Sequence, residues 1–277
     1  MQRVKVGDVT LAVHEWPGRG PAVVAVHGLT ANHTCWASLA DALAPAVRLI
    51  AYDLRGRGES DKPPAGYSLA THGEDLGRLL DHFGLSRAVL VGHSLGGGIV
   101  LRFAVTHPRR VAKLVLIDGG LDVRPEMLES LAPVIARVGR EFPSLDAFLE
   151  QMRGLSMLAG RWSDYLERYF RYDVETLPSG AVRPRAALHA IVEEVQSLAR
   201  ERLWAWHHQV RCPTLILRAP DGLLTPTDCL MTETEGRAMA RAIPRARLVT
   251  VPGTNHYTVL LGGHPRVRTA LRRFLAP

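Results

Sequence analysis

Cysteine is scarce in this sequence of 277 residues, which contains only Cys35, Cys212 and Cys229. Three thiols so far apart form neither a disulfide framework nor a metal-ligand set, so we expect buried free thiols and predict no metal and no cofactor. No apolar run reaches the roughly 18 residues that span a bilayer, and residues 1–8 lack the apolar stretch of a secretory signal. We therefore expect a cytoplasmic protein without a membrane span.

Lysine is scarce as well, and Lys5, Lys62 and Lys113 are the only examples, although the net charge is +7. Arginines carry the positive charge and are spread along the chain, which is typical of a solvated surface rather than of a nucleic-acid footprint. The polar loop at 53–61 has no Gly-Lys-Ser/Thr sequence, and no G-x-G-x-x-G opens a helix there. We expect no nucleic-acid partner, and we expect this loop to be held rigid by its own hydrogen bonds.

Hydrophobic residues make up 47% of the chain, which is enough for a sizeable core, and they fall into alternating strands and helices. We expect strands at 9–16, 21–26, 47–52, 88–91 and 111–117, and helices at 36–43, 68–83 and 95–107. This alternation predicts a parallel sheet covered by helices on both faces.

The alternation stops between residues 121 and 209. Helices are expected there at 127–138, 145–157, 162–172 and 185–206, before strands at 213–218 and 248–251 and helices at 233–243 and 265–275 resume the earlier pattern. We therefore divide the chain into a core formed by residues 1–120 and 210–277 and an inserted helical cap formed by residues 121–209. Most large aromatic side chains fall in the cap, where we expect some to pack on the core and others to line an apolar pocket.

A serine stands at a sharp corner in the middle of the core. The apolar strand that ends at Val91 runs into Gly-His-Ser-Leu-Gly at 92–96 and then directly into a helix, which is the required setting of the G-x-S-x-G pattern. Gly92 and Gly96 remove the side chains that would collide around a serine pushed out of the sheet. We therefore predict that Ser94 is a nucleophile.

Two backbone N–H groups are candidates for an oxyanion hole. The strand at 21–26 ends in His27-Gly28-Leu29, a flexible turn whose N–H of Leu29 can donate to an anion. The second candidate is the N–H of Leu95, because N–H groups at a helix start point toward the place where an oxyanion would form.

A serine hydroxyl needs an adjacent base at neutral pH. His256 follows the strand at 248–251 in a glycine-containing loop. Because the carboxyl ends of parallel strands share one edge of the sheet, His256 and Ser94 can meet there. We predict that His256 is the base.

Together these segments resemble the α/β-hydrolase family, in its cap-bearing branch of esterases, lipases and epoxide-hydrolase-like enzymes. The matching motifs are His27-Gly28, residues 53–60, residues 92–96 and Asn255-His256, in the family's order over nearly the whole chain. The resemblance implies an α/β fold with a mostly parallel eight-stranded sheet flanked by helices and an inserted helical cap. It also implies Ser94 as the nucleophile and His256 as the general base. The oxyanion hole would be formed by the amides of Leu29 and Leu95.

The acid of the catalytic triad is where this sequence departs from the family's usual pattern. Relatives commonly place it after the strand that corresponds to 213–218, in Gly-x-x-Asp-x-x-x-Pro, but that Asp falls on Gly222 here and Asp221 stands one residue early. A minority places the acid after the strand that follows the nucleophile helix, where Asp118 stands. Either position could fix the tautomer of the histidine. We favour Asp118, keep Asp221 as the alternative and rank Asp228 third.

These residues predict a serine hydrolase that cleaves carboxylic esters, with lactones as a variant, through an acyl-enzyme. A serine nucleophile argues against haloalkane dehalogenases and epoxide hydrolases, which attack with a carboxylate. The apolar cap favours a small ester-like substrate with a hydrophobic acyl or alcohol group. Alternatives are a cofactor-free perhydrolase, a C–C bond hydrolase, an amidase, a thioesterase and a non-catalytic small-molecule receptor of the same fold. A homodimer is left open.

Overall fold

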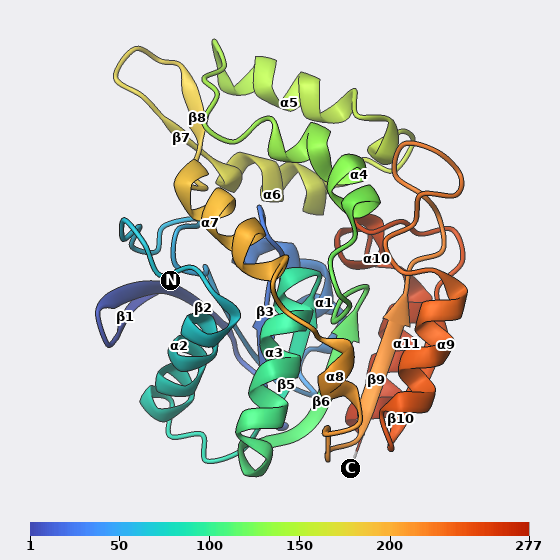
Figure 1. Ribbon diagram of the computed structural model, residues 1–277. Helices are drawn as coiled ribbons and strands as arrows, with labels where there is room; N and C mark the ends of the chain where they lie inside the picture. The colour runs from blue at the N-terminus through green and yellow to red at the C-terminus, as the bar shows by residue number, and fades with distance from the viewer. Residues whose placement is uncertain (277) are drawn as a thin grey trace.

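An eight-stranded sheet forms the centre of the computed structural model, which describes residues 1–276 (Figure 1). The strands are β1 (Gln2–Val6), β2 (Val9–Trp16), β3 (Ala22–Val26), β4 (Arg48–Tyr52), β5 (Ala88–His93), β6 (Val111–Ile117), β9 (Thr214–Arg218) and β10 (Ala246–Thr250). They lie in the order β1-β2-β4-β3-β5-β6-β9-β10, and only the β1–β2 and β2–β4 pairs are antiparallel. The predicted α/β fold with a mostly parallel eight-stranded sheet is confirmed.

Helices cover both faces of this sheet, because successive residues of a strand point to opposite sides. They are α1 (Ala37–Leu43), α2 (Leu69–His82), α3 (Leu95–Thr106), α9 (Glu233–Ala242) and α11 (Pro265–Leu275). On β3, Val23 belongs to the hydrophobic cluster that includes α1 and α11, whereas its neighbour Val24 belongs to the cluster that includes α2, α3 and α9. Within residues 1–276, no helix has the length and apolar character needed to cross a membrane.

Three details of the core were not predicted from the sequence. Strand β1 was not predicted, although Val4 and Val6 are buried where it pairs with β2. Strands β2 and β3 follow each other in the sequence but are not neighbours, because β4 pairs with both. A single turn of helix, α10 (Thr258–Leu261), was also missed, and it begins two residues after His256.

Residues 121–209, called the cap segment below, are mainly helical. They form α4 (Pro125–Ile135), α5 (Leu145–Arg153), α6 (Asp164–Asp173), α7 (Leu188–Leu198), α8 (Trp204–His207) and a small hairpin of β7 (Val174–Thr176) and β8 (Val182–Pro184). Most of these helices gather beyond one end of the sheet, whereas the last, α8, lies beside the sheet next to α3 (Figure 1). The prediction of one helix over 185–206 is wrong. That stretch breaks into α7 and α8, since Asp122 accepts hydrogen bonds from the N–H groups of Leu203 (2.5 Å) and Trp204 (3.3 Å), which begin a new helix.

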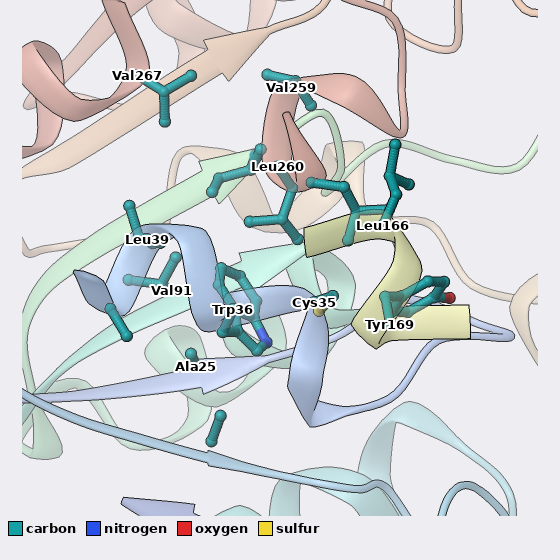
Figure 2. Packing of buried hydrophobic residues seen from close by; sticks show 14 of the residues in the cluster. Ala25, Cys35, Trp36, Leu39, Val91, Leu166, Tyr169, Val259, Leu260 and Val267 are labelled. Atoms are coloured by element: carbon teal, nitrogen blue, oxygen red, sulfur yellow. The ribbon is translucent and has the colours of Figure 1, made fainter. Parts of the chain in front are cut away.

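One hydrophobic cluster extends from the sheet into the cap segment. Figure 2 shows Trp36 and Cys35 between Ala25 of β3 and Tyr169 of α6, with Leu260 of α10 close by. Trp36 is completely buried. Since α6 shares this cluster with the sheet, it is packed on the core rather than tethered to it by linkers alone.

The positive charge is less evenly spread than we expected from the sequence. From Arg237 to Arg273 there are eight arginines and no aspartate or glutamate. This stretch forms α9, β10 and α11 at one edge of the sheet. Apolar residues separate most of these arginines in the sequence, so the local excess of positive charge is not obvious from any one short segment.

Candidate active site

Ser94 occupies the corner between β5 and α3 with φ of +56° and ψ of −120°. Among residues 1–276, only Ser94 and Asp118 combine a positive φ with a side chain other than glycine. Strain of this kind persists where surrounding structure imposes it, and it is common at functional sites. A Cβ on Gly92 would lie 2.2 Å from the Gly96 carbonyl oxygen, and one on Gly96 would lie 2.0 Å from the Val26 carbonyl oxygen. The corner therefore requires glycine on both sides of Ser94.

The structure brings His256 and Asp118 together. His256 Nδ1 lies 2.8 Å from Asp118 Oδ2, and both side chains are buried. The backbone N–H of Ala219 donates to the other carboxylate oxygen of Asp118 at 3.1 Å. With Nδ1–H donating to the carboxylate, the lone pair of His256 is on Nε2, which is the tautomer that a general base needs.

Ser94 and His256 follow parallel strands of the same sheet and line the same two hollows. Within residues 1–276, no hydrogen bond joins Ser94 Oγ to the His256 ring. Such bonds are often long in unliganded enzymes and shorten when substrate binds. The catalytic roles of Ser94, His256 and Asp118 therefore stay predictions, now with a geometry that suits them.

The two alternative acids are occupied elsewhere. Asp221 Oδ2 accepts a hydrogen bond from Arg161 at 3.1 Å. Asp228 folds its own loop, because its carboxylate accepts from the N–H groups of Leu223 at 2.7 Å and Thr225 at 3.1 Å. Burial works to raise the pKa of Asp228, but these backbone hydrogen bonds lower it below its usual value. Only Asp118 of the three candidates reaches His256.

His27 orients the candidate oxyanion donor. Its Nε2 accepts from the N–H of Leu54 at 3.0 Å, so its Nδ1–H is the donor to the Gly28 carbonyl at 2.8 Å. Burial lowers the pKa of His27 to about 4, which keeps the ring neutral. Because a peptide unit is planar and trans, fixing the Gly28 carbonyl turns the N–H of Leu29 the opposite way. That turn lies against the nucleophile, since a Cβ on Gly28 would be 3.2 Å from Ser94 Cβ.

The second predicted donor, the N–H of Leu95, lies at the start of α3. The first N–H groups of a helix have no partner inside the helix and carry its positive dipole. No acceptor within residues 1–276 takes the N–H of Leu29. Both groups are therefore available for an anion beside Ser94.

His93, the residue before the serine, contacts the backbone of the loop that carries His256. Its Nε2 lies 2.8 Å from the His256 carbonyl oxygen, and the two rings are 4.5 Å apart at 32°. Burial first, and His256 second, lower the pKa of His93 well below its usual value. A neutral His93 with Nε2–H donates to that carbonyl and so orients the backbone at His256.

Two hollows of about 480 and 670 Å³, open mouths included, meet at Ser94 and share Leu29, Leu131 and His256. Their walls are mostly aliphatic, and no lysine or arginine lines either one. The smaller hollow is lined by Gly28, Leu29, Thr30, Ala31, Cys35, His93, Ser94, Leu131, Val134, Ile135, Tyr169, His256, Tyr257, Leu260 and Leu261. We expected some cap aromatics to pack on the core and others to line an apolar pocket. Tyr169 is the single aromatic residue that the cap segment contributes to the two linings.

The other cap aromatics pack on one another or on the core. Phe170 stacks on Trp162 with ring centroids 5.5 Å apart, and Phe148 lies edge-on to both Phe142 and Phe170. Leucine, valine and methionine from α4 and α7 form most of the cap's share of the pocket instead.

The loop at 53–61 is held partly by its own hydrogen bonds, as expected, and partly by groups outside it. Asp53 is completely buried and accepts from the N–H of His33 at 2.8 Å, the N–H of Glu59 at 2.9 Å and the hydroxyl of Tyr172 at 2.6 Å. Burial works to raise the pKa of Asp53, but His33 and its other partners lower it below its usual value. Sequence reasoning missed one member of the loop, Arg57, whose Nε donates to the Leu29 carbonyl at 2.9 Å.

Comparison with known proteins gives the same family from an independent direction. Residues 21–263 match the family described as alpha/beta hydrolase fold. The chain is 30% identical to 2-(acetamidomethylene)succinate hydrolase of Mesorhizobium japonicum over 259 residues, which are 92% of this chain and 88% of that one.

Solved structures agree with that match. The crystal structure of E-2-(acetamidomethylene)succinate hydrolase is 28% identical with a TM-score of 0.85 and covers 99% of this chain and 98% of its own. A thermophilic esterase from Thermogutta terrifontis is also 28% identical, with a TM-score of 0.77 and coverage of 99% and 98%. Two of these names specify 2-(acetamidomethylene)succinate and the third specifies only an esterase, and a shared fold does not fix the substrate, so likeness to them leaves the substrate open.

Proposed function

The chain belongs to the alpha/beta hydrolase fold family, and from that premise we propose that it is a serine hydrolase that cleaves carboxylic esters through an acyl-enzyme. The observation that carries the proposal is the 2.8 Å contact between His256 Nδ1 and Asp118 Oδ2 beside a serine held at φ of +56°. A buried carboxylate that fixes a histidine next to a strained serine supports nucleophilic catalysis. The strained backbone of the serine lowers the stability of the fold, and strain of this kind clusters at active sites. The carboxylate holds the histidine in the tautomer that a general base needs.

In the proposed reaction, Ser94 Oγ attacks the ester carbonyl carbon while His256 Nε2 takes the hydroxyl proton. The carbonyl oxygen becomes an oxyanion that the N–H groups of Leu29 and Leu95 stabilise. When the C–O bond breaks, His256 returns the proton to the departing alcohol, which leaves the acyl group on Ser94. Water then attacks the acyl-enzyme, with His256 again taking and returning the proton, and the carboxylic acid is released.

The pocket supports a neutral substrate with an apolar acyl or alcohol group. Burying a carboxylate without a cation or a set of donors is costly, and neither hollow has a lysine or arginine in its lining. The succinate in the name of one relative is a dicarboxylate. We therefore propose that this chain accepts uncharged esters, or lactones of similar polarity, and that residues 121–209 act as the cap that shapes the pocket.

Steady-state hydrolysis of p-nitrophenyl esters of increasing acyl length tests this function. We expect turnover that rises from acetate toward medium-chain esters, labelling of Ser94 by a fluorophosphonate, and loss of both in Ser94→Ala with folding unchanged. Methyl butyrate should be a far better substrate than its charged analogue monomethyl succinate. If Ser94 is not labelled and no ester is turned over, the serine hydrolase is rejected. That result is what a non-catalytic receptor of this fold would give.

The same assay separates the other chemistries that could use these residues. Matched amides, thioesters, lactones and β-diketones replace the ester, and hydrogen peroxide replaces water as the acceptor in a peracid assay. Esters should give the highest kcat/KM among these compounds. If another class of compound gives a higher kcat/KM, Ser94 remains the proposed nucleophile and that class replaces esters as the proposed substrate.

A further inference from the structure

The turn that carries the first oxyanion donor, residues 28–31, is held by two arginines that the reaction above does not use. Arg57 Nε donates to the Leu29 carbonyl at 2.9 Å, and Arg137 Nη2 donates to the Thr30 carbonyl at 3.1 Å. Both arginine side chains are buried. Two successive carbonyls of residues 28–31 are thus anchored by charged donors, the stronger class of hydrogen bond.

Each arginine is paired with a carboxylate of the cap segment. Arg57 Nη2 donates to Glu194 Oε2 on α7. Arg137, between α4 and α5, donates to Asp173 Oδ2 at the end of α6 through Nε at 3.1 Å and Nη2 at 2.8 Å. Asn32 Nδ2 reaches the other oxygen of Asp173 at 3.3 Å. The two pairs therefore connect residues 28–31 with two different cap helices.

Both pairs are buried, so their charges have lost the solvation of water. Burial works to raise the pKa of Glu194, but His72 and Arg57 lower it to about 2, which keeps it ionised at neutral pH. His72 Nε2 lies 2.9 Å from Glu194 Oε1, although not in hydrogen-bond geometry. Desolvation cancels much of what a buried pair gains, so such pairs are a poor source of stability and are better explained by the position they impose.

The group that these contacts position is the N–H of Leu29. The Gly28 carbonyl is fixed by His27, and the Leu29 carbonyl is fixed by Arg57. Because peptide units are planar, fixing the carbonyls on both sides of Leu29 fixes its φ and ψ and hence the direction of its N–H. Arg137 extends the restraint to the next peptide, at Thr30.

We propose that Arg57 and Arg137 are positioning residues that couple docking of the cap segment to formation of the oxyanion hole. Glu194 can hold Arg57 only when α7 lies on the core. Asp173 holds Arg137 within the cap segment, and Arg137 reaches the Thr30 carbonyl only when that segment lies on the core. The two guanidinium groups in turn hold residues 28–31. Docking of the cap thus both closes the pocket and sets the N–H of Leu29. This inference rests on the proposed function, because it takes Leu29 as an oxyanion donor.

Two charge-conserving variants test the coupling. Arg57→Lys and Arg137→Lys keep a positive charge but lose the forked geometry that reaches a carbonyl and a carboxylate together. We expect kcat for a p-nitrophenyl ester to fall by about 10- to 100-fold with KM within about twofold, since one oxyanion donor is misplaced rather than removed. The inhibition constant of a trifluoromethyl ketone, whose oxyanion adduct needs the same donor, should rise by the same factor.

Asp75→Asn is the matched control. It breaks the Arg55–Asp75 pair, which is equally buried, with contacts of 2.7 and 2.8 Å, but does not touch residues 28–31. We expect it to lower the melting temperature and leave kcat and the inhibition constant within about twofold. An equal loss of kcat in Asp75→Asn would overturn the coupling, because general loosening would then explain the effect.

Glu194→Gln keeps the shape and a hydrogen bond but removes the cap's charge, and it decides the matter if the lysine variants do not fold. A kcat at least threefold lower, with the ketone affinity reduced in parallel, supports the coupling. Folded variants with wild-type kcat overturn it. A wild-type protein with neither ester turnover nor labelling of Ser94 defeats the proposed function instead, so the two failures are distinguishable.

Discussion

The corner around Ser94 and the cap segment contribute to one site by different physical means. At the corner the backbone is specialised, with φ of +56° at Ser94 and no room for a Cβ on Gly92 or Gly96. The cap segment has ordinary backbone, and it acts through the side chains that reach the core. Glu194 meets a core residue 137 positions away in the chain, and Arg137 meets one 107 positions away.

This difference predicts how damage should be distributed. In the proposed mechanism the corner and the loop that carries His256 hold the reacting atoms, so changes there should remove chemistry or folding. In our proposal the cap segment sets the shape of the pocket and the direction of the N–H of Leu29. Changes there should therefore alter the rate or the choice of substrate by smaller factors. The four predictions below run from the largest expected effect to the smallest, and each could break this division.

Asp118→Asn should cause the largest loss, because an amide at this place favours the wrong tautomer of His256. We expect kcat to fall by about 10³- to 10⁴-fold with KM little changed. Asp221→Asn, which touches only the half-exposed pair with Arg161, should stay within about threefold. Stopped-flow or steady-state ester hydrolysis on both variants decides, and the reverse ranking would move the acid to the loop after β9.

Gly96→Ala should damage folding itself. Its Cβ would lie 2.0 Å from the Val26 carbonyl oxygen, so β3 and α3 would have to separate, and we expect a loss of about 3 kcal/mol in the free energy of unfolding. Gly73→Ala is the control, because its Cβ meets nothing within 4 Å on α2, and it should stabilise by about 1 kcal/mol. Urea unfolding measures both. Equal effects would show that the corner is not specially constrained.

The corner was also the part of the site that could be predicted from the sequence. Gly92 and Gly96 flank Ser94 within five residues, and the strand and the helix around them can be recognised from local hydrophobic patterns. The choice between Asp118 and Asp221 could be narrowed because the family's usual pattern puts its acid on Gly222 and leaves Asp221 one residue early. Local hydrophobic patterns also predicted the other strands of the sheet and its flanking helices to within a few residues, whereas β1 was missed.

The cap segment could not be predicted in this way. Nothing near Arg57 indicates that it will pair with Glu194, because the pairing depends on how α7 docks. The break between α7 and α8 depends on Asp122, which lies some 80 residues earlier in the chain. Aromatic composition could not indicate which rings line the pocket. Of the cap aromatics only Tyr169 does, while others pack on one another, with Trp162 on Phe170 as one example.

Acid should weaken the protein in two pH ranges, an upper one to which buried histidines such as His27 contribute and a lower one to which Glu194 of the cap segment contributes. Burial lowers the pKa of His27 to about 4, and the pKa of Glu194 is lowered to about 2. Both folded-state values lie below the unfolded ones of 6.5 and 4.5, so the unfolded chain binds each proton first and stability falls as pH falls. We expect losses on the order of 3 kcal/mol from His27 between pH 6.5 and 4, and similar losses from Glu194 between pH 4.5 and 2.

Urea unfolding as a function of pH measures these steps. His27→Asn should flatten the free energy of unfolding in the upper window, and Glu194→Gln should flatten it in the lower one, whatever each change does to stability at pH 7. If both variants keep the wild-type slopes, these two groups are not what makes the protein acid-sensitive, and the contrast between core and cap does not extend to proton binding.

Leu131→Ala should have the smallest effect, and an effect on choice rather than on chemistry. Leu131 of α4 lines both hollows beside Ser94, so its truncation enlarges the pocket without touching the reacting atoms. We expect kcat/KM to rise severalfold for longer acyl esters and to change by less than about threefold for short ones, because one or two methylenes in a pocket are worth roughly 1–3 kcal/mol. Leu188→Ala, on the exposed side of α7, should leave the whole chain-length profile unchanged. A uniform fall of kcat across all esters in Leu131→Ala would contradict the division, since a cap leucine would then be supporting the chemistry itself.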